Sequence, residues 1–561
     1  MGIQARRIIG CFIFCCGVLS CEGRTLFIAP NGDDLSAVPD DSSHPYGTLE
    51  RAFRALQNGD RLEIQAGNYQ VQPNYPSPIY PEPSPGTPMP LMNLTNVVVI
   101  GNGQVDIFGP GPGDFISVTD CRNIRVENLT LRSDGTGIPE TDPPNYANPT
   151  FSTIMLRGKN EGLHFENLRI LSFGNHGISH LHGQKTSFNM VVTNCYFADG
   201  GDGNYSLLDE DGAAVSGVSS GARIENNVVE RCFRGLEVEG AWGAPITNVV
   251  IEGNLLTNCH TIGIMLFATT HTEEYHRLYG DIRIRNNHIV NMAAHPDLVK
   301  YPAVRTMFGI LLQGGDDMEV TGNHIEGIPG GLGISLNSQR MAMKNVLVAS
   351  NTVLNTRFRG IQVYQFGTNV LEEVRVNNNR ISEAVEAGIL LNGSRIECIG
   401  NVVENSASFN EIAAIKLMHD YLGSENALIC DNVITNRNDG YADNGIWIRS
   451  GARNATLFGN RFYSVPLGAI RDEGVGTAIL PKIQTLRRNA SNVSVSAFGL
   501  PGLRYQLEVS HDLAGWRKVD EQSCAQTGMF DLNYVPDPPR VSPAGTILRV
   551  VSAVEPAPAF E

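Results

Sequence analysis

Ile251-Glu252-Gly253-Asn254-Leu255-Leu256 and Gly263-Ile264-Met265-Leu266 are the two signature stretches of one repeat, and this repeat decides the fold. A short stretch of alternating apolar residues leads to an Asn, and a Gly-Ile-x-Leu strand follows nine residues later. Successive copies are 22 to 39 residues apart, a spacing typical of proteins in which one unit stacks on the next. The repeat is counted on twelve asparagines, which are Asn128, Asn167, Asn194, Asn227, Asn254, Asn287, Asn323, Asn351, Asn379, Asn401, Asn432 and Asn460.

The strands of this repeat predict a solenoid. Each strand alternates with period two, so one of its faces is apolar. A single unit is too short to carry a helix and cannot bury its apolar face alone, whereas units stacked at ~4.8 Å share a continuous core. Asn suits the turns, because it tolerates the left-handed conformation and its amide can bond to the next coil. Twelve coils at ~4.8 Å would form a rod of about 58 Å.

The repeat resembles the right-handed parallel β-helix superfamily, the pectate-lyase-like fold, over roughly residues 25–475. The N-terminal stretches 26–34, 45–49, 59–64 and 66–69 look like the cap of that superfamily, in which a short helix, here about Leu49–Gln57, plugs the open end. The resemblance implies an all-β right-handed parallel β-helix solenoid of about 12 coils with an N-terminal cap helix, of the secreted bacterial carbohydrate-active type.

The two ends of the chain differ from the repeat. Arg6 and Arg7 precede an apolar run from Ile8 to Leu19, which predicts a secretory signal in residues 1–21 that is too short to span a bilayer. Cys21 lies in a segment similar to a bacterial lipobox, so lipidation and ordinary cleavage both stay open. We expect the β-helix at 22–480 and a small C-terminal β-sandwich-like module, or a cap on the last coil, at 483–561. The protein is then secreted, periplasmic or cell-surface, and touches membrane only through a lipid on Cys21.

Composition excludes several classes of protein. Charged residues make up 18%, against a usual value of about 25%, and the 59 Gly and 30 Pro disfavour helical bundles. A net charge of −16 argues against broad nucleic-acid binding. The seven cysteines after the signal form no CxxC pair, so a zinc or redox site is unsupported. Cys232 and Cys259, each five residues after its Asn, are interpreted as core filling, with a disulfide as the alternative.

Candidate functional residues follow from the Gly-Ile-x-Leu strand. Its Ile and Leu face inward, so the x residue and the residue after Leu should face solvent. The connections that lead into this strand are long at three places, 133–152, 199–212 and 292–308, and the connection that follows it is long at 268–280. Insertions on both sides of the outward stripe predict a groove over coils two to six, which suits a polysaccharide. The outward stripe comprises Arg157, Ser179, Ser216, Glu237, Glu239, Met265, Phe267, Leu311, Gln313, Ser335, Asn337, Gln362, Tyr364, Leu390, Asn392, Lys416, Trp447, Arg449 and Arg471.

The groove contents suggest acid–base chemistry on a glycosidic bond. Glu237 and Glu239 lie on one face of a strand with Cα atoms ~6.6 Å apart, and a hydrolase needs two carboxylates. The catalytic candidates are Glu237, Glu239, Asp211 and His180, and the substrate-binding candidates are His182, Phe267, Gln313, Arg157, His271 and Tyr364. No cofactor is required by this scheme. The acidic run that contains Asp199, Asp202 and Asp209 is either a plain polar loop or a Ca²⁺ site.

The charges favour hydrolysis of a neutral glycan over elimination. Arg157, Lys416, Arg449 and Arg471 are scattered along the stripe rather than clustered, which disfavours a lyase with a dense basic cleft. The Arg-Ile-Lys pattern of polygalacturonases and the Asp-Pro-His-Asp pattern of alginate epimerases are both absent from the sequence. A polysaccharide is therefore the expected partner. A lyase, an epimerase and a non-catalytic glycan-binding or adhesion solenoid stay open as alternatives.

Overall fold

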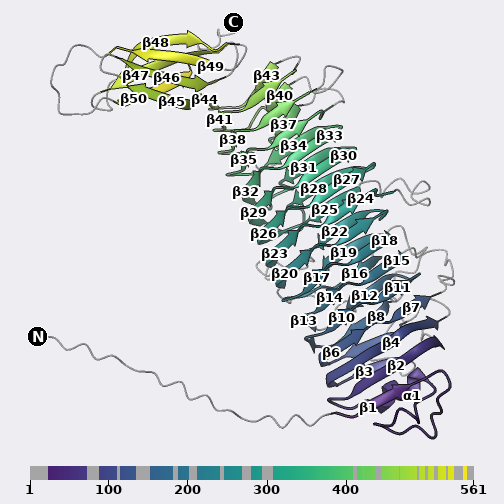
Figure 1. Cartoon of the computed structure of the whole chain (residues 1–561). Helices are drawn as coiled ribbons and strands as arrows, with labels where there is room; N and C mark the ends of the chain where they lie inside the picture. Colours follow the sequence, from purple (N-terminus) through teal and green to yellow (C-terminus); the bar gives the residue numbers. More distant parts are fainter. Residues whose placement is uncertain are drawn as a thin grey trace, which may run out of the picture.

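The computed structural model shows a long stack of parallel β-coils followed by a small antiparallel unit (Figure 1). The stack is all-β apart from one short helix in the described residues. The structure describes residues 23–71, 87–109, 114–133, 152–180, 187–200, 212–239, 246–267, 279–293, 307–407, 413–420, 423–436, 444–465, 468–488, 492–499, 503–510, 516–525, 529–535 and 547–552.

Three columns of parallel strands run along the rod, and we call them the first, second and third faces. Within one coil the chain passes from the first face to the second, then to the third, and then to the first face of the next coil. The third face contains fourteen strands, two more than the predicted number of coils. These are β3 (Met89–Met92), β5 (Ile116–Thr119), β8 (Ser152–Arg157), β12 (His176–His180), β16 (Ala213–Val215), β19 (Arg234–Glu239), β22 (Ile262–Phe267), β25 (Met307–Leu312), β28 (Gly331–Asn337), β31 (Arg359–Tyr364), β34 (Ala387–Asn392), β37 (Ala413–Leu417), β40 (Asn444–Ile448) and β43 (Gly468–Asp472).

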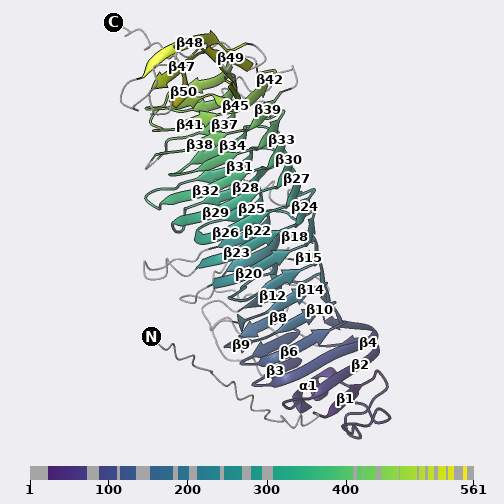
Figure 2. The same ribbon diagram turned by 60° about the vertical axis from the view of Figure 1, so that its left-hand side comes forward.

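The first and second faces are paired in the same parallel way (Figure 2). The first face consists of β1 (Thr25–Ile28), β2 (Arg61–Gln70), β4 (Thr95–Gly109), β6 (Arg122–Glu127), β9 (Asn160–Glu161), β10 (His164–Glu166), β13 (Ser187–Phe188), β14 (Val191–Thr193), β17 (Arg223–Glu225), β20 (Ile246–Glu252), β23 (Tyr279–Arg285), β26 (Gly315–Thr321), β29 (Met343–Ala349), β32 (Leu371–Asn377), β35 (Glu397–Ile399), β38 (Leu428–Cys430), β41 (Thr456–Phe458) and β44 (Ala478–Leu480). The second face continues from the ends of β2 and β4 through β7 (Thr130–Ser133), β11 (Arg169–Leu171), β15 (Tyr196–Gly200), β18 (Val228–Cys232), β21 (Leu255–Thr257), β24 (His288–Val290), β27 (His324–Ile328), β30 (Thr352–Thr356), β33 (Arg380–Ala384), β36 (Val402–Glu404), β39 (Val433–Thr435) and β42 (Arg461–Tyr463).

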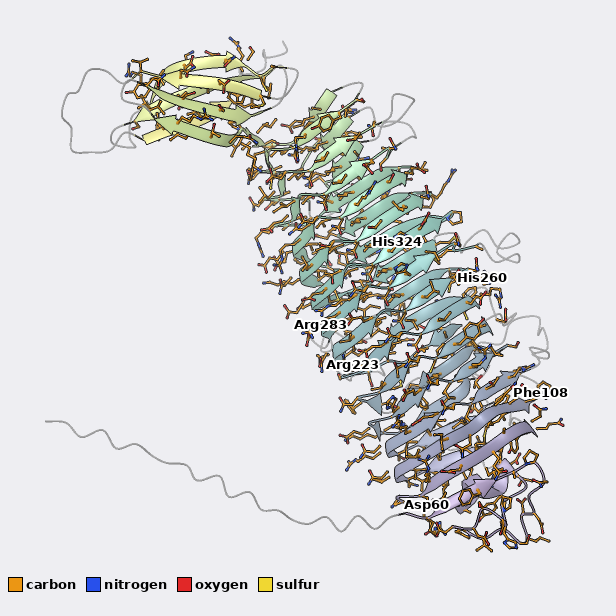
Figure 3. The ribbon with its side chains drawn as sticks, viewed as in Figure 1. Asp60, Phe108, Arg223, His260, Arg283 and His324 are labelled. Carbon is orange, nitrogen blue, oxygen red and sulfur yellow. The ribbon has the colours of Figure 1, made fainter. Side chains whose placement is uncertain are left out.

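The core fills the space between the three faces. In one coil Ile251 comes from the first face, Leu256 from the second, and Ile264 and Leu266 from the third, and all four are fully buried. Burying such a side chain contributes about 1.5–3 kcal/mol, and every coil adds several of them to one continuous cluster. The side chains that alternate with these core residues point outward, and Figure 3 shows two of them, Arg223 and Arg283, projecting from the outside of the first face.

The glycine of Gly-Ile-x-Leu is explained by close approach of backbones. A Cβ on Gly360 would lie 2.7 Å from the carbonyl oxygen of Gly388 in the next coil and 2.3 Å from Cγ2 of Ile381. The same carbonyl contact would arise at Gly309 against Gly333, at 2.6 Å. A column of glycines therefore lets the third face turn tightly away from the second.

The asparagine ladder begins later than the repeat count predicts. From Asn227 to Asn460, each buried side-chain amide donates to the side-chain oxygen of the next asparagine, at 2.9–3.0 Å along the whole series. Asn128, Asn167 and Asn194 are not in this column, because they occupy the preceding turn position with φ of 52–57°. The ladder position of the early coils is filled by apolar side chains such as Leu129, so the ladder has nine members rather than twelve.

A helical cap closes the N-terminal end. Helix α1 (Leu49–Ala55) begins at Thr48, whose hydroxyl accepts from the backbone N–H of Arg51, and it ends two residues before the predicted Gln57. Its buried residues join the solenoid core. Asp60, labelled at that end of the rod in Figure 3, accepts from the Gln57 backbone N–H and from the Arg24 guanidinium, so the turn after the helix is held in place.

The last strands form an antiparallel unit of two three-stranded sheets. Its separate core includes Tyr505 and Phe530, whose rings stack with centroids 4.5 Å apart. No helix in the described ranges is long and apolar enough to cross a membrane. The strands are β45 (Lys482–Arg488), β46 (Val493–Phe498) and β49 (Met529–Tyr534) in one sheet, and β48 (Arg517–Ser523), β47 (Arg504–Ser510) and β50 (Ile547–Ser552) in the other.

Cys232 and Cys259 are buried free thiols in the second-face region, as the core-filling interpretation expects. Burial raises the pKa of both thiols, that of Cys259 to about 12. Both cysteines therefore act as small apolar residues of the core.

Candidate functional site

The outside of the third face carries two columns of side chains, and strand pairing confirms the predicted stripe. Glu237 pairs with Met265 and Glu239 with Phe267, and this register continues coil by coil. The inner column comprises Glu237, Met265, Leu311, Ser335, Gln362, Leu390, Lys416, Trp447 and Arg471. The outer column comprises Glu239, Phe267, Gln313, Asn337, Tyr364 and Asn392.

Most of the inner column is buried, so the expectation that it faces solvent is wrong. In several coils the residue just before the glycine packs against the inner column or bonds to it. Ile262 and Phe308 occupy this place next to Met265, and Arg234 and Arg359 occupy it in other coils. The outer column stays half-buried except for Asn392, and it forms the accessible surface of this face.

Glu237 belongs to the covered column. Its side chain is 2% exposed and lies in a buried ion pair, with Oε1 2.8 Å from Nη1 of Arg234. Its Oε2 accepts from the Ser216 hydroxyl at 3.1 Å. Both carboxylate oxygens are thus bonded, and Glu237 does not contact a sugar on the surface in this conformation.

Glu239 lies at the accessible end of the same strand. It is half-buried and in register with Phe267 of the next coil. The Arg340 guanidinium lies over the Phe267 ring, 4.6 Å from its centroid, so that ring face is already covered. Gln313 follows in the column, with its amide nitrogen 3.5 Å from the side-chain oxygen of Gln339. Glu239, Phe267 and Gln313 are therefore brought together as predicted.

Arg157 and His180 are buried, against the prediction for both. Arg157 donates Nη2 to Asp114 at 2.8 Å, and the two side chains are 2% and 1% exposed. Burial raises the pKa of Asp114 to about 6, although the Arg157 charge and hydrogen bond act in the opposite direction. His180 pairs with Leu156 at the end of β12, so it continues the inward register. Neither residue lies on the accessible column.

The remaining predicted site residues come from the insertions. Asp211, His182, His271, Asp202 and Asp209 lie outside the described residues, and their roles stay predictions. Asp199 is described, and its carboxylate lies 2.5 Å from Nε of Arg231, which occupies it as an ion pair. Within the described ranges, no group of three or more His, Cys, Asp and Glu could hold a metal ion.

The insertions leave the corners that the sequence predicts. Residues 134–151, 201–211 and 294–306 each connect the second face to the third, and 268–278 connects the third face to the first. They therefore leave the two long edges of the third face, on either side of the two columns.

A basic cluster near the far end of the third face was missed by the sequence analysis. Lys416, Trp447 and Arg471 are direct neighbours in the inner column, on β37, β40 and β43. The Lys416 ammonium lies 4.5 Å and the Arg471 guanidinium 4.3 Å from the Trp447 ring centroid, and Arg449 adds a third cation at 5.3 Å. The expectation that these cations are scattered is wrong. Counting the register of the stripe could have found the cluster, since separations of 31 and 24 residues are single coil steps.

The chain matches a family model described as a right handed beta helix region over residues 273–406. With the three-sided parallel stack, this match identifies the fold as the right-handed parallel β-helix that the resemblance implied. No curated protein matches the chain.

Several solved structures are similar in fold. The tailspike protein of E. coli bacteriophage HK620, in complex with a pentasaccharide, is 12% identical with a TM-score of 0.48, covering 94% of this chain and 86% of that one. The A-module of a mannuronan C-5 epimerase from Azotobacter vinelandii is 13% identical with a TM-score of 0.37, covering 76% and 93%. A lacto-N-biosidase from Eubacterium ramulus is 14% identical with a TM-score of 0.46, covering 79% and 68%.

Proposed function

We propose that this protein is a secreted polysaccharide-acting protein that binds an extended glycan along the outer column and hydrolyses it beside Glu239. The observation that carries the proposal is the accessible outer column itself, which runs along the rod axis on the third face. Each coil adds one side chain to it at steps of ~4.8 Å, and apart from Phe267 these carry carboxylate, amide or phenol groups. The amides and the phenol both donate and accept hydrogen bonds and the carboxylate accepts them, so together they match sugar hydroxyls.

Glu239 is the carboxylate of this column that faces a bound glycan. Glycoside hydrolysis needs a second carboxyl group on the other side of the scissile bond. Glu237 does not supply it in this conformation, because both of its oxygens are bonded to Arg234 and Ser216. Asp211, from the insertion between β15 and β16, stays the candidate for the second group. The Glu237–Arg234 pair then holds β19 and with it the backbone that positions Glu239.

A non-catalytic glycan-binding solenoid is the second candidate function. The burial of Glu237 favours it, because one member of the predicted acid–base pair is withdrawn from the surface. The two functions differ in product and share the binding surface.

The test is a screen of neutral and acidic polysaccharides for release of reducing ends and for absorbance of unsaturated ends. Reducing ends alone indicate hydrolysis, and both signals together indicate elimination. Removing an acid–base catalyst costs about 10²–10⁴-fold in rate, so Glu239→Gln should lower turnover by that factor and leave glycan binding in place. Glu404→Gln is the matched control, since Glu404 is a half-buried glutamate of the second face paired with Arg380. Binding without any product establishes the second function. If Glu239→Gln binds and cleaves the glycan as the wild type does, Glu239 does not have the proposed role.

A further inference from the structure

We propose that Lys416, Arg449 and Arg471, gathered around Trp447, form a subsite for the anionic group, carboxylate or sulfate ester, of an acidic sugar. The subsite rests on the proposed function, because it assigns the substrate class of the same third face. It lies on β37, β40 and β43, the last strands of that face, with Arg449 directly after the end of β40 (Figure 1).

The three cations converge by register. Lys416 and Arg471 flank Trp447 from the coils on either side, with Cα atoms ~10 Å apart, and their charged groups lie against the ring. Arg449 follows Trp447 by two residues, directly after the end of β40, and its guanidinium lies 5.3 Å from the ring centroid. The ring itself is 4% exposed, so it is a support for the cations rather than a surface on which a sugar stacks.

Two of these cations lack an acidic partner within the part of the chain that is described. Arg471 is paired with Glu473 at 2.6 Å, whereas neither Lys416 nor Arg449 has a carboxylate at ion-pair distance there. The other arginines of the third face are all paired: Arg157 with Asp114, Arg234 with Glu237 and Arg359 with Glu386. Lys416 and Arg449 therefore differ from the arginines within the strands of the described third face, each of which has a carboxylate partner.

The surroundings of Lys416 favour a bound anion. Its side chain is half-buried, and burial lowers the pKa of its ammonium, as do the charges of Arg449 and Arg359. Glu386 and Asp420 act in the opposite direction but do not outweigh these effects. An anion between Lys416 and Arg449 would stabilise both charges, and Arg449 can bind a carboxylate or a sulfate with two parallel hydrogen bonds.

The position of the subsite relates it to the proposed glycan path. Six coil steps separate β19 from β37, which places Lys416 about 29 Å along the axis from Glu239. Tyr364 lies between them, and its hydroxyl is 3.5 Å from Asp420, next to the cluster. The subsite therefore selects the glycan and takes no part in bond cleavage. The overall negative charge of the chain predicts a neutral glycan, whereas this subsite favours a glycan that contains acidic sugars.

The experiment measures binding of three polymers by the full chain: polygalacturonate for carboxylate, dextran sulfate for sulfate, and dextran as the neutral probe. The double variant Lys416→Met/Arg449→Gln keeps side-chain length and removes two charges. Arg375→Gln is the matched control, since Arg375 is an exposed arginine of the first face that bonds an asparagine. We expect at least a tenfold preference for one anionic polymer over dextran, lost in the double variant and kept in Arg375→Gln and Arg449→Lys, with unchanged thermal unfolding.

The outcomes separate this proposal from the proposed function. Tighter binding of polygalacturonate than of dextran sulfate identifies a carboxylate subsite, and the reverse identifies a sulfate subsite. Equal loss of anion binding in Arg375→Gln, or a preference that survives the double variant, overturns the subsite. Cleavage of a glycan without an anionic preference overturns the subsite alone. Anionic preference that depends on Lys416 and Arg449, in a protein that cleaves nothing, keeps the subsite and rejects the hydrolase.

Discussion

Substitution of Asn323 by Ala tests the ladder at its centre. Asn323 is buried, and its side-chain oxygen accepts from the backbone N–H and the amide of Asn287, both at 3.0 Å. Its own amide donates to Ile284 and to Asn351, both at 2.9 Å. Alanine leaves two buried donors of Asn287 without a partner, and each costs about 1–3 kcal/mol, so we expect unfolding to become easier by about 2–6 kcal/mol.

Urea denaturation measures this loss, and hydrogen exchange locates it, because opening should concentrate in the coils that contain Asn287 and Asn351. Asn128→Gly is the matched control. Asn128 has φ of 57° and lies outside the ladder, where glycine tolerates its turn and only an exposed hydrogen bond from Asn167 at 3.2 Å is lost. We expect less than about 1 kcal/mol there. Equal destabilisation by both variants, or less than about 1 kcal/mol at Asn323, would falsify this account of the ladder.

Two further predictions concern the core of the rod. The folded-state pKa of Asp114 is raised to about 6 from 3.8, so the folded protein binds this proton more readily than the unfolded chain. Its contribution to stability is therefore complete below pH 3.8 and declines as the pH rises to about 6. The difference between wild type and Asp114→Asn in the free energy of unfolding should follow that decline, and a flat difference between pH 4 and 6 would contradict it. Gly360→Ala should lower stability by about 1–3 kcal/mol, because the new Cβ meets the Gly388 carbonyl and Ile381, and an unchanged melting temperature would refute the close-approach argument.

The period-two pattern of the strands predicts which side chains share the outward stripe. Glu237 and Glu239 were placed on one outer surface, and their pairing with Met265 and Phe267 confirms the register, because alternation along a strand is a local property. Their exposure could not be predicted in the same way. Arg234 precedes Glu237 by three residues on β19 and bonds one carboxylate oxygen, and Ser216 of the preceding coil bonds the other.

Asn128 and Asn227 illustrate a second limit. Both follow an apolar strand, but Asn128 lies one position earlier, at a turn residue with positive φ, while Asn227 points into the core. The apolar residues keep the same spacing in both units, five residues from Val126 to Leu131 and from Ile224 to Val229, so only the position of the Asn between them decides whether it is buried. The ladder therefore needs several coils in register before it exists.

The repeat by itself determined that this chain forms a parallel β-solenoid with an outward stripe, since period-two strands, glycine corners and asparagine turns act within a single coil. The tertiary structure alone decided which residues of that stripe are accessible and which meet. Glu237 was buried by Arg234, and Lys416, Trp447 and Arg471, which are 55 residues apart from first to last, became neighbours because each coil places its strand directly on the one before. The contacts among Lys416, Trp447 and Arg471 arise between coils, so the chemistry of this cluster exists only when the coils are stacked.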